Sequence, residues 1–103
     1  MRTPEVVFEK LRVARERLDF EQHIFDAVNA RNNAARTLRK FMLNGLDKYP
    51  WITQDELEEV TRRCDMTAHE LIACRTRVKQ ARQQVEALED ELAQSSVILN
   101  ASR

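Results

Sequence analysis

The chain has 103 residues, 43% of them hydrophobic and 33% charged, and its seventeen basic and seventeen acidic side chains cancel. With one glycine and two prolines, this composition argues against general disorder and favours long helices joined by few turns. No apolar run reaches the roughly 18 residues of a membrane span, and the N-terminal segment lacks the form of a secretory signal, so we expect no membrane partner.

The first predicted helix covers residues 4–44. Thr3 is a favourable N-cap, Pro4 suits the first helical position, and Glu5 places a negative charge in the first turn. The helix should stop at Asn44-Gly45, because both residue types tolerate the left-handed conformation that often caps a helix C-terminus.

A turn is predicted over residues 45–52, where Pro50 keeps Tyr49 out of helical geometry. Thr53 and Glu56 then have the spacing of a capping box. Ile52 before this box and Leu57 after it can form a hydrophobic staple. We therefore predict a second helix from Gln54 to about Ser95, followed by a frayed C-terminal segment over residues 96–103.

One unbroken heptad register runs along the second helix. The a positions are Leu57, Cys64, Leu71, Val78, Val85, Leu92 and Leu99. The d positions are Val60, Thr67, Cys74, Ala81, Leu88 and Ser95. Such a repeat predicts a long helix with one narrow apolar seam, which other helices must cover.

Two helices of similar length and a short connector favour an antiparallel, coiled-coil-like hairpin, so we expect an all-α fold in which residues 1–103 form one domain. Residue i of the first helix should lie roughly beside residue 99 − i of the second. The first helix has a seam at Val7, Leu11, Ala14, Leu18, Phe25 and Val28. Its second half is apolar over a wider arc, formed by Phe20, Ile24, Ala27, Ala34, Ala35, Leu38, Phe41, Met42 and Leu46.

This arc is wider than one antiparallel helix can cover. We therefore expect two hairpins to dimerise into a four-helix bundle, or a helix of another protein to dock on residues 20–46. The expected protein interface consists of Phe20, Ile24, Leu38, Phe41, Met42, Leu71, Val78 and Val85. Tyr49, Trp51 and Phe41 should cap one end of the bundle, or else form an exposed aromatic tip.

The sequence contains no motif that indicates catalysis. It has no glycine-rich phosphate loop, no paired CxxC and no HExxH, and His23 and His69 are isolated. Cys64 and Cys74 occupy seam positions, where free cysteine behaves as a small hydrophobe, and about 15 Å of helix separates them. We expect two reduced cysteines in a cytoplasmic setting, and neither a catalytic site nor a metal, cofactor or small-molecule substrate.

The basic residues are unevenly distributed, which raises a second possibility. No acidic residue occurs over residues 27–46 or 71–85. In the hairpin register the second of these stretches lies beside the basic part of residues 10–17. The expected basic face consists of Arg12, Arg15, Arg17, Arg75, Lys79 and Arg82. Such a face, interleaved with amides, could follow the phosphates of a nucleic-acid duplex such as double-stranded RNA without reading its sequence.

In this organisation the chain resembles several groups of short helical hairpins. These are bacterial secretion co-chaperones, small tubulin-folding cofactors and the four-helix-bundle RNA-silencing suppressors of small insect viruses, which bind double-stranded RNA. The resemblance is one of architecture, without a shared motif, and architecture does not fix function. It keeps two functions open: a protein-binding helical module and a duplex-binding dimer.

Overall fold

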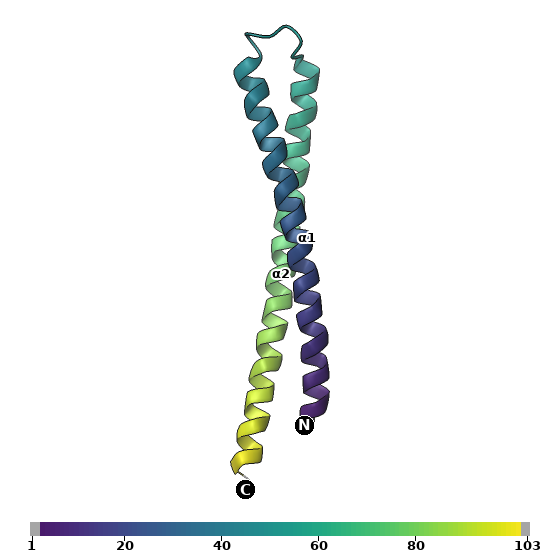
Figure 1. The fold of residues 1–103 in the computed structure, drawn as a ribbon, viewed down its shortest axis with the longest axis vertical. Helices are drawn as coiled ribbons and strands as arrows, with labels where there is room; N and C mark the ends of the chain where they lie inside the picture. Colours follow the sequence, from purple (N-terminus) through teal and green to yellow (C-terminus); the bar gives the residue numbers. More distant parts are fainter. Residues whose placement is uncertain (1–2, 102–103) are drawn as a thin grey trace. The chain divides into compact units, whose positions relative to one another are not determined.

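Two long α-helices, α1 and α2, make up most of the protein (Figure 1). In a computed structural model that describes residues 3–101, with side chains as far as Ser95, α1 covers Pro4–Gly45 and α2 covers Gln54–Ala101. The all-α prediction is confirmed, and both helix starts are correct to the residue. The predicted packing of the two helices as an antiparallel hairpin is also confirmed.

Each helix begins with the cap that the sequence predicts. The Thr3 hydroxyl accepts a hydrogen bond from the backbone N–H of Val6, at 3.4 Å. The Thr53 hydroxyl accepts one from the backbone N–H of Glu56, at 3.2 Å. These bonds satisfy N–H groups that the first turn of a helix leaves without a partner.

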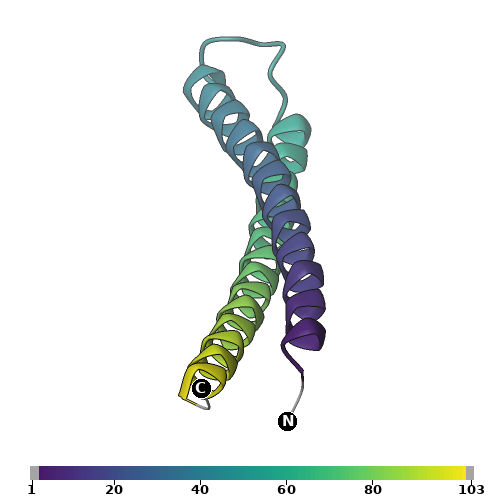
Figure 2. The same cartoon turned by 60° about the horizontal axis from the view of Figure 1, so that its bottom comes forward.

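The end of α1 differs from the prediction. Gly45 is the last helical residue and does not adopt a positive φ, so the expected left-handed cap is wrong. Its carbonyl accepts hydrogen bonds from the N–H groups of Lys48 and Tyr49, at 3.0 and 2.9 Å, which closes the loop between the helices (Figure 2). A Cβ atom on Gly45 would lie 2.8 Å from Ile52 Cδ1 and 2.9 Å from Tyr49 Cδ2. Glycine is therefore used here to make room for the returning loop.

The second helix is longer than predicted. Its backbone stays helical to Ala101, whereas the predicted end was near Ser95, with fraying from residue 96. The reason is that no glycine or proline follows Pro50, so no strong stop signal interrupts the helix. The expectation for residues 102 and 103 lies outside the described residues.

The hairpin divides into two units, each with its own core. The first unit combines Met1–His23 with Thr76–Arg103, and the second is Ile24–Arg75. The core of the first unit consists of Val7, Leu11, Ala14, Val85 and Leu88, with Leu18 and Leu92 packed against it. The core of the second unit consists of Met42, Leu57 and Val60, with Leu46 and Ile52 packed against it. The single domain of the sequence analysis is thus a hairpin with two cores.

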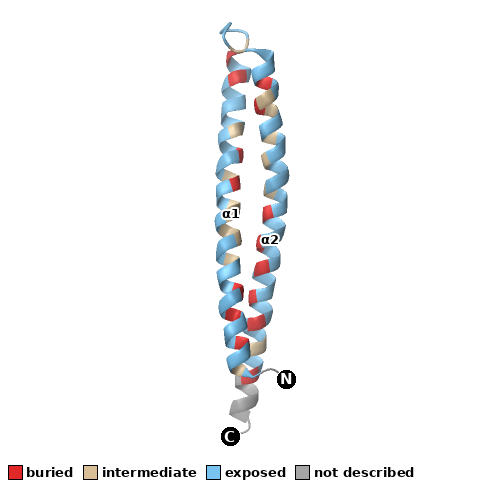
Figure 3. Cartoon of the chain, turned by 90° about the vertical axis from the view of Figure 1, so that its right-hand side faces the viewer, coloured by how far each residue is buried: buried red, intermediate tan, exposed pale blue. Residues whose placement is uncertain are grey.

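The heptad register of α2 is confirmed over the part whose side chains are described. Every a and d residue from Leu57 to Ser95 is buried or half-buried. In both units these residues lie on the side of α2 that faces α1, and the outer sides are exposed (Figure 3). The predicted pairing of the helices also holds, since Asn32 in α1 bonds to Thr67, its expected neighbour in α2.

The buried seam of α1 continues through its second half, where the sequence analysis saw only a broad apolar arc. Asn32 belongs to this seam and is 5% exposed. Its amide donates to Thr67 Oγ1 at 2.9 Å and to the Cys64 carbonyl at 3.4 Å. Thr67 Oγ1 lies 2.8 Å from the Arg63 carbonyl, to which it donates. A polar layer therefore interrupts the apolar core of the second unit.

Candidate interaction surfaces

The eight predicted interface residues divide according to whether the hairpin itself uses them. Three residues, Met42, Val78 and Val85, are less than 9% exposed. They occupy seam positions and pack inside the single chain, so they are not available on its surface. The other five retain exposed area: Ile24 and Leu71 are half-buried, and Phe20, Leu38 and Phe41 are exposed.

An apolar groove of about 420 Å³ opens between the two helices of the second unit. Residues from both helices line this apolar groove: Ala34, Ala35 and Leu38 from α1, with Val60 and Met66 from α2. Leu38 and Met66 are 45% and 58% exposed. Charged side chains flank the groove, and Arg31 forms an ion pair with Glu70 at 3.1 Å.

A second hollow of about 490 Å³ continues the apolar groove toward the loop. It shares Leu38, Val60 and Arg63 with the apolar groove and reaches Met42 and Ile52. The residues that close the core at the loop end thus also form the floor of an open apolar surface. A partner docked there would extend the existing core.

A polar groove of about 830 Å³ is lined by other residues of the same unit. From α1 come Asn33, Arg36, Lys40 and Asn44, which belong to the stretch without acidic residues. Asp65 lines it from α2. The neighbouring Arg39 donates from Nε to Thr61 Oγ1 at 3.1 Å, which fixes its position against α2. This groove can accept negative charge along its α1 wall.

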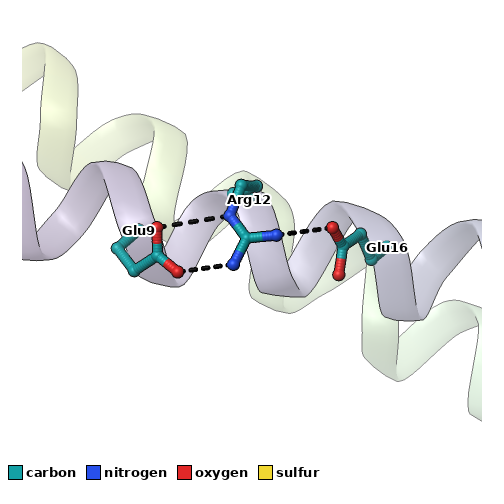
Figure 4. Close-up of polar contacts among 3 residues, drawn as sticks. All are labelled: Glu9, Arg12 and Glu16. Carbon is teal, nitrogen blue, oxygen red and sulfur yellow. Dashed lines mark hydrogen bonds and ion pairs between the residues drawn. The ribbon is translucent and has the colours of Figure 1, made fainter.

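Arg12, the first residue of the predicted basic face, has two carboxylate partners on its own helix. Its guanidinium donates to both carboxylate oxygens of Glu9, at 3.2 and 2.5 Å, and to Glu16 at 2.6 Å (Figure 4). Hydrogen bonding and charge lower the pKa of Glu9 and raise the pKa of Arg12. Nη2 of Arg15 lies 3.5 Å from Oε1 of Glu89. Two of the six basic residues are therefore neutralised by carboxylates.

The other four basic residues are distributed over both units. Arg17 lines a groove of the first unit with Lys10 and Val13, whereas Arg12 and Arg15 line a different hollow. Lys79 and Arg82 belong to the first unit, and Arg75 belongs to the second. Heptad position separates only Arg17 from the other basic residues. With Leu11 at a in α1 and Leu71 at a in α2, Arg17 occupies g, whereas Arg15, Arg75 and Arg82 occupy e. In an antiparallel pair, e and g positions flank opposite sides of the seam.

The loop carries two stacked aromatic rings. The ring centroids of Tyr49 and Trp51 are 4.8 Å apart, with 25° between the ring planes. Trp51 is 68% exposed, and Phe41 is exposed as well. Within this stack it is the Tyr49 ring that lies against Gly45, which explains the position of the stack in the fold. The Trp51 ring remains accessible.

The remaining polar candidates are engaged in local contacts. Nδ1 of His23 lies 2.7 Å from the Asp19 carbonyl, and Nδ1 of His69 lies 2.8 Å from the Asp65 carbonyl. Cys64 is half-buried, Cys74 is buried, and neither forms a disulfide within the described residues. Within the described residues no three His, Cys, Asp or Glu side chains gather to hold a metal ion. Neither helix, as far as it is described, has a stretch long and apolar enough to cross a membrane.

None of the protein families, curated proteins or solved structures compared with the chain matches it. Of the surfaces of the hairpin, the apolar groove has the clearest chemical character, because exposed apolar side chains from two helices meet there.

Proposed function

We propose that the protein is a non-enzymatic α-helical interaction module, and that it binds a protein helix through the apolar groove of its second unit. One observation carries this proposal: Leu38 and Met66, from different helices, are both about half exposed and line the same groove. Burying an aliphatic side chain of this size contributes about 1.5–3 kcal/mol. A helix with an apolar face would fill the groove as a third member of the bundle.

The charges around the groove support a helical occupant. The Arg31–Glu70 pair and Arg63 offer both signs of charge beside apolar residues. A helix that presents leucines toward the groove can carry acidic and basic residues on its flanks, as helices in coiled coils do. Such flanking pairs select the orientation of a partner more than they add to affinity.

The proposal is tested with a labelled peptide of three heptads that carries leucine at its a and d positions. At a concentration low enough for the chain to be a monomer, we expect it to bind this peptide and Leu38→Glu to weaken binding at least about tenfold, because a charge would be buried in an apolar site. Fluorescence anisotropy measures the affinity, and circular dichroism checks that the hairpin remains helical.

Ile72→Glu is the matched control, because Ile72 is also an exposed apolar residue, in α2, and does not line the groove. It should bind the peptide like the unchanged chain. Equal binding by Leu38→Glu, or no binding by the unchanged chain at a concentration where it is monomeric, would remove the basis of the proposal.

The alternative function is duplex nucleic-acid binding, and the polar groove is the observation that favours it. Arg36 and Lys40 provide positive charge there beside the amides of Asn33 and Asn44. Binding to an RNA duplex should weaken steeply with salt and should be lost in the double variant Arg36→Gln/Lys40→Gln. A gel-shift experiment at low salt decides this, and an unshifted duplex would rule the alternative out.

A further inference from the structure

An exposed apolar residue recurs at every seventh position of α1. This outer stripe consists of Val6, Val13, Phe20, Ala27, Ala34 and Phe41. All six are exposed, and the two phenylalanines are 62% and 71% exposed. The first three belong to the first unit and the other three to the second. The seam that packs against α2 uses none of them.

The outer stripe is one half of a second seam on α1. In the heptad that places Leu11 at a and Ala14 at d, the outer stripe occupies every c position. The g positions beside it are Lys10, Arg17, Ile24, Arg31 and Leu38. Positions c and g alternate at spacings of three and four residues and lie about 100° around the helix from a and d. A helix with two such seams packs against two neighbours, as each helix of a four-helix bundle does.

We propose that the outer stripe binds a second copy of this chain, with the two α1 helices antiparallel. This inference rests on the proposed function, because it names the helix that occupies the apolar groove. In each unit a groove borders the seam: Val13 lines one in the first unit, and Ala34 and Leu38 line one in the second. An α1 helix of another copy therefore meets an open, partly apolar surface in both units.

The charges at the g positions determine the orientation. In a parallel pair each residue faces its own copy, so Lys10, Arg17 and Arg31 would each oppose the same positive charge, which is destabilising. In an antiparallel pair g positions face c positions. We choose the register that pairs position i with position 44 − i of the partner. Lys10 then lies opposite the partner's Ala34, and Arg17 lies opposite the partner's Ala27, where small side chains leave room for the long ones.

Some apolar members also match in this register, whereas Val13 lies opposite the partner's Arg31. Leu38 lies opposite the partner's Val6, and Ile24 lies opposite the partner's Phe20. The charges of the two halves of α1 are complementary as well. Residues 5–26 contain six acidic and four basic side chains, whereas residues 27–45 contain four basic side chains and no acidic one. An antiparallel pair brings the acidic half of each helix beside the basic half of the other.

The exposed area is of the size that a stable dimer uses. A phenylalanine side chain can bury about 150–250 Å², and two phenylalanines, two valines and Leu38 are each more than 40% exposed. These side chains offer several hundred Å² of apolar surface per copy. A standard interface buries about 800 Å² per partner. The aliphatic parts of the flanking Lys and Arg side chains would supply the remaining area.

Disulfide trapping tests both the partner and the orientation. The double variant Val6→Cys/Leu38→Cys should form a covalent dimer on mild oxidation, because the new thiol at position 6 of one copy would meet the new thiol at position 38 of the other. Both positions lie on one helix, about 48 Å apart along its axis, so no bond can form between them within a chain. Each single variant should remain uncrosslinked. The single variants also show whether Cys64 or Cys74 contributes to any crosslink.

Light scattering provides the second readout. The unchanged chain should have the mass of a dimer, and Phe20→Glu should have the mass of a monomer with unchanged helicity, whereas Ile72→Glu should stay dimeric. Crosslinking of Val6→Cys alone would indicate parallel helices and overturn the proposal. A monomer at every concentration would also overturn the proposed dimer. If that monomer still binds the leucine-heptad peptide, the proposed function stands.

Discussion

Arg12 illustrates how helical spacing decides the role of a charged residue. Glu9 and Glu16 lie three and four positions away on the same helix, so both carboxylates reach its guanidinium. Because all three side chains are more than half exposed, the network adds little to stability. Its main consequence is that Arg12 presents no free charge to an anionic partner.

This network predicts a shifted titration of Glu9. Hydrogen bonding and charge from Arg12 hold the pKa of Glu9 below its ordinary value of 4.5. The stabilisation is therefore present above pH 4.5 and is lost as the pH falls through the lower pKa of the folded state. An NMR titration of the carboxyl carbon should show this low pKa in the unchanged chain and a return toward 4.5 in Arg12→Gln.

Arg15→Gln is the control, because Arg15 pairs with Glu89 instead. The pKa of Glu9 should not change in this variant. Titration of Glu9 at 4.5 in the unchanged chain would contradict the contact with Arg12.

Local contacts were predictable from the sequence where residue type and spacing are sufficient. The caps at Thr3 and Thr53 are examples, since both hydroxyls bond where the pattern places them. The basic face was not predictable in this way. Arg12 and Arg17 are close in sequence, but they line different grooves, because they occupy heptad positions b and g, which a search for clustered charges does not distinguish.

The pairing of the helices depends on a polar contact at a seam position. Asn32 is buried and reaches α2 through Thr67 and the Cys64 carbonyl. A buried asparagine at such a position favours one alignment of the helices and reduces stability relative to an apolar residue. Asn32 was not predicted as a seam residue, because its side chain carries no apolar signal.

Asn32→Leu should therefore stabilise the hairpin and loosen its alignment. Thr67 keeps the Arg63 carbonyl as a hydrogen-bond acceptor, so the substitution leaves no buried hydroxyl without a partner. We expect the free energy of unfolding to rise by about 1 kcal/mol, measured by urea denaturation. Additional amide signals near Thr67 in NMR spectra would report a second alignment.

The control is Asn33→Leu, at an exposed position next in sequence. Its effect on the free energy of unfolding should stay within about 0.5 kcal/mol. A loss of stability in Asn32→Leu would show that the hydrogen bonds contribute more than apolar burial does at this position.

At the scale of the whole molecule, both helices are continuous, but the buried apolar contacts are concentrated in two separate cores. The sequence predicted the hairpin because two long helical patterns are joined by one short turn. It did not predict two units, because the heptad of α2 passes through Cys74 and Val78 without a break. The division arises from the distribution of the large apolar contacts, which gather around Leu11 in one unit and Leu57 in the other.

Substitutions in the two cores should therefore act locally. Leu11→Ala and Leu57→Ala each remove a buried leucine, which is expected to destabilise its surroundings by about 2–5 kcal/mol. Hydrogen exchange followed by mass spectrometry should show faster exchange in residues 4–23 and 76–95 for Leu11→Ala, and in residues 24–75 for Leu57→Ala. Proteins open in such cooperative segments when contacts are concentrated within them. Equal acceleration of both segments by either substitution would show instead that the hairpin opens as a single unit.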